Sequence, residues 1–163
     1  MGLHLFRQRT KQLLSSEEGL LGHLRRLPQE EVVEVAAHLD ALLPPVGVLI
    51  PLPGAEGVAE QLGAWRGLPV VRASGVDALT GSADAALVTA QLSDGVAELD
   101  LCLRAAHSGV RVRAVAALVE RTGAGGRSRL EIQGTEVLPV LEVADTPEGL
   151  LFERRDTRTH GLH

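Results

Sequence analysis

The stretch AALVTAQLSDGVAELDLCLRAAHSGVRVRAVAALVER, residues 85–121, determines the predicted fold class. It opens with a short apolar run, Ala85–Ala90, and closes with a second one, Val112–Val119. A polar turn over 91–96 leads from the first run into a predicted helix, Ala97–His107. Two buried strands joined through a helix are typical of parallel pairing, because parallel strands need a long crossover connection. The stretch therefore predicts an α/β protein.

The same alternation continues on both sides of this stretch. Three further apolar runs predict strands at Val46–Leu52, Leu68–Ala73 and Val137–Val143. Together these runs predict an open, mainly parallel five-stranded sheet flanked by helices. Ligands of such sheets lie beyond the carboxyl ends of the strands. The turns after Leu52 and Ala90 are therefore expected at one edge.

The first 43 residues predict a helical element in three pieces. Leu3–Leu14 is amphipathic, and a second helix starts at the hydroxyl cap of Ser15 and Ser16. The third piece, Gln29–Leu43, ends at Pro44-Pro45. We therefore expect an N-terminal helical element over 1–43, an α/β domain over 44–152 and a polar tail over 153–163.

Composition excludes several classes of function. The formal charge of −5 and the scattered arginines argue against nucleic acid as the main partner. No apolar run reaches the length of a membrane span, so no membrane association and a cytoplasmic location are expected. Cys102 is the only cysteine, and the six histidines are dispersed, so neither an internal disulfide nor a metal site is predicted.

A set of glycines and charged residues follows the central stretch at characteristic spacing. Gly109 ends the helix, Glu120-Arg121 closes the next strand, and the segment Gly125-Gly126-Arg127, Leu130 and Gly134 follows. With this layout the chain resembles the type I phosphoribosyltransferases over residues 46–143. The diagnostic segment of that family is an apolar strand, two adjacent acids, and then Thr-Gly-Gly-Thr opening a helix.

This resemblance implies two ligand-binding turns. The candidate pyrophosphate turn is Leu52, Pro53 and Gly54. The candidate ribose-phosphate turn consists of Thr89, Ala90, Ser93, Asp94, Gly95, Val96 and Ala97. In the family these turns hold phosphate through backbone amides and hydroxyls at a helix N-terminus. Without ligand, the glycines would only shape the turns, and Ser93 or Asp94 would cap the next helix.

The second turn departs from the family pattern in its chemistry. The family's acids fall on Thr89 and Ala90, and the phosphate turn falls on 94–97, where only Gly95 matches. Asp94 would place an anion against the phosphate. The short connection Ser74–Asp84 cannot supply the family's long mobile lid. No catalytic residue is therefore assigned.

Three functions follow from this combination. The first is a phosphoribosyltransferase-related protein without ordinary transferase activity, which binds a nucleotide-like or phosphorylated small ligand or acts as a regulatory or structural homologue. The second is a purely structural subunit. The third is an active purine or pyrimidine phosphoribosyltransferase, a glycosyltransferase that would use Mg²⁺ at a divergent site. The resemblance also implies a homodimer.

Overall fold

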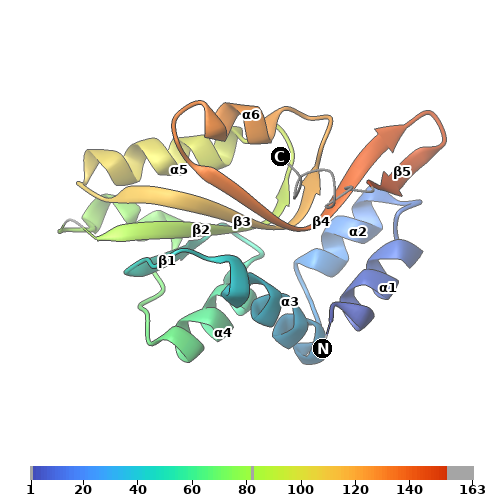
Figure 1. The fold of residues 1–163 in the computed structure, drawn as a ribbon, viewed down its shortest axis with the longest axis horizontal. Coiled ribbons are helices and arrows are strands. Elements are labelled where there is room, and N and C mark those ends of the chain that lie inside the picture. The colour runs from blue at the N-terminus through green and yellow to red at the C-terminus, as the bar shows by residue number, and fades with distance from the viewer. Residues whose placement is uncertain (1, 82, 154–163) are drawn as a thin grey trace, which may run out of the picture.

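The computed structural model describes residues 2–81 and 83–153, and its centre is a five-stranded sheet in the order β1-β2-β3-β4-β5. Four strands are parallel neighbours, and the fifth is antiparallel to β4. Their bounds are Val48–Pro51 (β1), Asp84–Leu92 (β2), Arg111–Arg121 (β3), Glu136–Thr146 (β4) and Gly149–Phe152 (β5). The predicted α/β class with a mainly parallel five-stranded sheet is confirmed (Figure 1).

One predicted strand is wrong. The segment Leu68–Ala73 forms a single bridge, Leu49 to Val70, and then enters a 3-10 helix, η1, at Ala73–Ala78. Two hydrogen bonds form around Leu49, from its own N–H to Pro69 O and from Val71 N to its carbonyl. Pro69 has no N–H to extend the pairing backward, and the chain enters η1 soon after Val71. The fifth strand is instead β5, which folds back on β4 after a short turn.

Helices cover both faces of the sheet (Figure 1). One face carries the N-terminal helices and α4, and the other carries α5 and α6. Their bounds are His4–Gln12 (α1), Glu17–Leu24 (α2), Gln29–Leu42 (α3), Glu56–Arg66 (α4), Val96–His107 (α5) and Gly126–Glu131 (α6). The sheet is therefore the middle layer of three.

Alternating residues of the strands supply two separate cores. Ala86 and Val88 of β2 pack with the N-terminal helices, whereas Ala85 and Leu87 pack beneath α5 and α6. This follows from the two-residue period of a strand. Small alanines in β2 and β3 let the helices approach closely.

The N-terminal helices pack in the same core as the sheet. Phe6 and Leu20 are fully buried in the cluster that also contains Ala86. The start of α2 is capped as its sequence predicts, because Ser16 Oγ accepts a hydrogen bond from Gly19 N at 3.0 Å. Of the tail expected over 153–163, only Glu153 lies within the described residues.

Among the described residues, no helix combines the length and the apolar character needed to cross a bilayer. Within the same residues, no three His, Cys, Asp or Glu side chains are grouped as metal ligands.

Candidate functional site

The two candidate turns lie at the same edge of the sheet, where β1 and β2 end. The first turn leads from β1 into α4, and the second leads from β2 into α5. The turn between β3 and α6 lies beside the second one, because β2 and β3 are parallel neighbours. This edge is where ligands of open α/β sheets bind.

Thr89 and Ala90, on which the resemblance predicts the family's paired acids to fall, are both buried. Thr89 is 3% exposed and donates a hydrogen bond to Glu98 Oε2 at 2.7 Å, beneath α5. Ala90 is 4% exposed and packs in the core on the opposite face of the sheet. Neither residue presents a polar group to the edge of the sheet.

The amide at the start of α5 is occupied by a carboxylate of the same turn. Asp94 Oδ1 accepts a hydrogen bond from Val96 N at 3.0 Å, and Gly95 is the N-cap residue with a φ of 76°. Of the two predicted capping side chains, it is therefore Asp94 that holds the amide, while Ser93 Oγ accepts from the Gln91 side chain at 3.3 Å. Asp94 thus takes the place that an anion would need.

Helix α6 fills the space beside this turn. Gly126 N donates to Ser93 O at 3.0 Å, and Arg129 Nε donates to Asp94 O at 2.8 Å. A Cβ on Gly95 would lie 3.0 Å from Gly126 Cα, so two backbones meet here without side chains between them. The segment that follows β3 therefore closes the second turn.

The first turn is arranged in a similar way. Gly54 has a φ of 96°, and its amide donates to Glu56 Oε1 at 2.8 Å. Leu52 is 8% exposed and belongs to the core rather than to the surface of the turn, whereas Pro53 is exposed. The side chain of Arg25 lies over Gly54, because a Cβ there would be 2.6 Å from Arg25 Cγ. Both candidate turns therefore carry a carboxylate of their own on a backbone amide.

Helix α2 runs along this edge on the face opposite α5 and α6. At its start, Glu17 accepts a hydrogen bond from Arg121 Nη2 at 3.0 Å, and Arg121, at the end of β3, also pairs with Asp145. At its end, Arg25 reaches the turn after β1. The N-terminal element therefore covers one side of the edge where a ligand would bind.

A buried ion pair lies beneath α6 and was missed in the sequence interpretation. Glu120 is 2% exposed and accepts two hydrogen bonds from Arg127, at 2.6 Å from Nη2 and 3.0 Å from Nε. The hydrogen bonds that Arg127 donates to Glu120 raise the pKa of its guanidinium, which stays charged. The only available signal was an acid at the end of a strand seven positions before an arginine.

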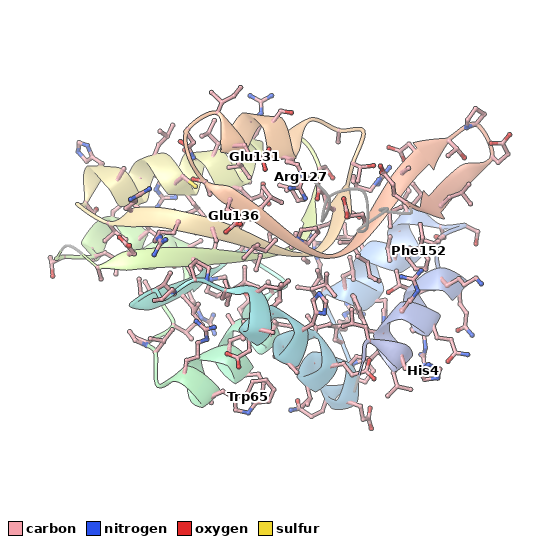
Figure 2. The ribbon with its side chains drawn as sticks, in the orientation of Figure 1. His4, Trp65, Arg127, Glu131, Glu136 and Phe152 are labelled. Atoms are coloured by element: carbon pink, nitrogen blue, oxygen red, sulfur yellow. The ribbon has the colours of Figure 1, made fainter. Side chains whose placement is uncertain are left out.

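Phe152, the last residue of β5, contacts a side chain of α1. The guanidinium carbon of Arg7 lies 4.5 Å from the centre of the Phe152 ring (Figure 2). This is the geometry of a cation–π contact. The contact links α1 to β5.

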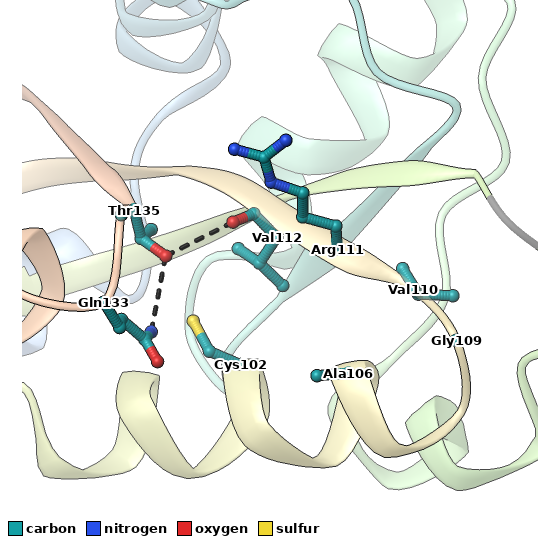
Figure 3. Close-up of a pocket in the computed structure, with 9 residues that line it drawn as sticks. Cys102, Ala106, Gly109, Val110, Arg111, Val112, Gln133 and Thr135 are labelled. Atoms are coloured by element: carbon teal, nitrogen blue, oxygen red, sulfur yellow. Dashed lines mark hydrogen bonds between the residues drawn. The ribbon is translucent and has the colours of Figure 1, made fainter.

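A hollow of about 290 Å³ lies at the opposite edge of the sheet, near the start of β3 (Figure 3). Cys102 of α5 lines it together with Gln133 and Thr135. Thr135 Oγ1 donates to Val112 O at 3.2 Å and accepts from Gln133 Nε2 at 3.3 Å. The polar side chains of Gln133 and Thr135 are thus hydrogen-bonded within the protein.

Cys102 is expected to react slowly with a thiol reagent in the folded protein. Burial raises the pKa of its thiol and thereby lowers the fraction of reactive thiolate. We expect alkylation by iodoacetamide at pH 8 to be roughly tenfold or more slower than in denaturant. Mass spectrometry measures the alkylation. Equal rates in the folded and the denatured protein would contradict a buried structural role for Cys102.

Comparison with solved structures gives a consistent result. Adenine phosphoribosyltransferase from Thermoanaerobacter pseudethanolicus matches 69% of this chain and 80% of its own, at 14% identity and a TM-score of 0.61. Orotate phosphoribosyltransferase from Mycobacterium tuberculosis matches 71% of this chain and 75% of its own, at 22% identity and 0.61. Leishmania donovani UMP synthase matches 73% of this chain and only 29% of its own, at 18% identity and 0.65.

No family model and no curated protein sequence matches the chain. The likeness is therefore one of structure, at identities that show the fold alone. It agrees with the mainly parallel sheet flanked by helices and with the helical N-terminal element. The chain has the fold of the type I phosphoribosyltransferases.

Proposed function

We propose that this chain is a phosphoribosyltransferase-related protein that has lost ordinary transferase activity and acts as a structural or regulatory homologue. The observation that carries the proposal is the closed second turn. Asp94 holds the Val96 amide at 3.0 Å, and Gly126 packs against the turn through backbone contacts. A phosphorylated sugar would have to displace both.

The chemistry of the edge supports this proposal. Binding of two ribose hydroxyls needs hydrogen-bond acceptors. The Thr89 hydroxyl already donates to Glu98, and the Ala90 side chain is apolar. Binding of a phosphate dianion needs free amides, whereas the amides of Gly54 and Val96 already bond to carboxylates. A phosphate placed near Glu56 and Asp94 would meet like charges.

Two further features argue against an active enzyme. The connection between β1 and β2 contains the α4 helix, the Val70 bridge and the short η1 helix, which leaves little chain for a cover over bound substrate. The resemblance implies magnesium for an active relative. Residues 89 and 90 offer no carboxylate to bind this ion. The donor set at this edge does not match that ion, so no catalytic step is assigned to it.

Binding of a nucleotide-like or phosphorylated ligand at this edge would require the turn to open. The closed turn therefore favours the structural role within the proposal. We place the protein in the cytoplasm as a homodimer, in line with its fold and with the apolar outer surface of its N-terminal helices.

The proposal predicts no binding of 5-phosphoribosyl 1-pyrophosphate by isothermal titration, with or without magnesium. The expected physical reason is repulsion by Asp94 and Glu56 together with the occupied amides. Nucleoside monophosphates are titrated alongside, and an active adenine phosphoribosyltransferase serves as the positive control. Magnesium-dependent micromolar binding, followed by base transfer in an assay, would overturn the proposal.

A further inference from the structure

The outer surface of the N-terminal layer carries several exposed apolar side chains. Helix α3 packs between α1 and α4, so its outward side forms the middle of this surface. Of the large hydrophobic side chains exposed in the described part of the chain, four lie on these three helices: Leu5 (46%), Val33 (36%), Leu42 (44%) and Trp65 (46%). We call this surface, the exposed side chains of α1, α3 and α4, the outer helical face.

A stripe of small and branched side chains runs along α3 at the centre of this face. Val33, Ala37 and Ala41 are exposed and spaced four residues apart, which places them in one row along the helix. The row carries no charge. Short side chains of this kind allow a second helix to approach closely.

A hollow of about 290 Å³ lies between the stripe and the residues that precede α1. The stripe forms one wall of this hollow, and the rest of its lining is Gly2, Leu3, Glu34, His38 and Leu42. Burial lowers the pKa of the His38 imidazole, so this side chain adds no positive charge at neutral pH. The hollow reaches the second half of α3, because Ala41 and Leu42 are near the end of that helix.

On the α4 side of the stripe lies Trp65, which projects from the outer surface (Figure 2). Its neighbour Arg66 donates to Asp40 Oδ1 at 2.6 Å and to Leu43 O at 3.2 Å. These bonds place Trp65 at the level of the second half of α3. Trp65 is therefore level with the end of the hollow that Ala41 and Leu42 line, on the other side of the stripe.

Two opposite charges are arranged in the same way near the start of α3. Arg9 of α1 lies beside Glu30, the second residue of α3, in a shared surface depression. Glu60 of α4 precedes Gln61, which accepts a hydrogen bond from Gln29 at 3.3 Å. Arg9 and Glu60 are exposed and take part in no ion pair within the described residues. They too lie at one height on opposite sides of the stripe.

We infer that the outer helical face binds a second copy of this chain through a two-fold axis parallel to α3. Such an axis exchanges the two sides of the stripe without changing the height along it. Trp65 of each copy then enters the hollow of the other, and Arg9 of each copy meets Glu60 of the other. The two α3 helices lie side by side and parallel.

The alternative two-fold axis, perpendicular to α3, is disfavoured by charge. It would place α1 against α1, and α1 contains Arg7, Arg9 and Lys11 with no acidic residue. Like charges across an interface cost free energy, whereas the parallel arrangement pairs opposite charges. Trp65 would also lose the hollow as its partner. The inference rests on the homodimer proposed above and is independent of the loss of transferase chemistry.

The first test measures self-association by sedimentation equilibrium and by fluorescence of Trp65. Trp65 is the only tryptophan and the chain has no tyrosine, so its emission reports directly on this face. We expect the emission to shift to shorter wavelength as the concentration rises and Trp65 loses water. Ala41→Glu should raise the dissociation constant roughly 30-fold or more, as removal of a central interface contact does.

The matched control is Leu103→Glu. Leu103 is 57% exposed on α5, in the other helical layer, so this variant adds the same charge to an exposed helix away from the outer helical face. It should dimerise like the parent protein. A dimer that is insensitive to Ala41→Glu would overturn the assigned face while leaving the homodimer in place. A monomer at every concentration would overturn both, without bearing on transferase activity.

Disulfide crosslinking tests the direction of the two helices. In a Cys102→Ala background, Val33→Cys alone and Ala41→Cys alone should each form a covalent dimer under mild oxidation, because a parallel axis brings each position close to its own copy. An antiparallel pair would instead crosslink only when the two variants are mixed. That result would overturn the parallel arrangement.

Discussion

Gly126→Ala is expected to lower the free energy of unfolding by about 3 kcal/mol, the cost of overpacking a rigid site. A Cβ at this position would overlap the Ser93 carbonyl oxygen and lie 3.1 Å from Gly95 N. Both neighbours are backbone atoms, so no side chain can rotate away. The hydrogen bond from Gly126 N to Ser93 O, 3.0 Å long, would also be strained. Urea unfolding followed by circular dichroism measures the change.

Helix propensity alone predicts that Gly126→Ala raises the free energy of unfolding, so a control at another helical glycine is informative. Alanine in place of an exposed helical glycine stabilises by roughly 0.5–1 kcal/mol. A Cβ added to Gly22 of α2 would meet no atom within 4 Å, so Gly22→Ala should give that gain. If Gly126→Ala were as stable as the parent protein, α6 would not be packed against the second turn. The main observation behind the proposed function would then fail.

Two of the strands that the sequence predicts correctly have apolar runs that are buried on both faces. Ala85–Ala90 and Val112–Val119 lie inside β2 and β3, where nearly every residue is buried. The run 68–73 is also mainly apolar, but it contains Arg72 and Pro69, which lacks an N–H donor, and only Val70 pairs. Strand β5 contains only four residues and alternates in burial, so its sequence signal is weak. Its pairing with β4 depends on the short hairpin turn between Thr146 and Gly149.

The candidate site shows a different limit of sequence reasoning. The position of both turns follows from strand order, and the sequence shows directly that residues 89 and 90 are not acidic. The sequence does not show that other groups of the chain already bond to these turns, because this depends on contacts between residues far apart in the sequence. Arg129 reaches Asp94 across 35 positions, and Gly126 meets Ser93 only once β3 lies beside β2. Local sequence patterns do not predict such long-range contacts.

Arg127→Ala is expected to cost about 3–5 kcal/mol, because it leaves a buried carboxylate without its partner. The side chain of Glu120 is 3% exposed, and two hydrogen bonds from Arg127 satisfy it. Water cannot readily reach Glu120 once the guanidinium is removed. The loss is a large part of the stability of a small domain, so the urea midpoint should fall markedly. Arg127→Lys should recover only part of it, because an ammonium group cannot form the paired hydrogen bonds.

The third member of this cluster provides the control. Glu131 accepts from Arg127 Nη1 at 3.3 Å, but its side chain is 48% exposed (Figure 2). Exposed pairs four residues apart on a helix contribute about 0.3–0.5 kcal/mol, so Glu131→Ala should lie within that range. Equal effects of the two alanine variants would mean that Glu120 is solvated or bonded elsewhere. A large effect at Arg127 alone would support a buried ion pair that holds α6 against β3, and α6 in turn closes the second turn.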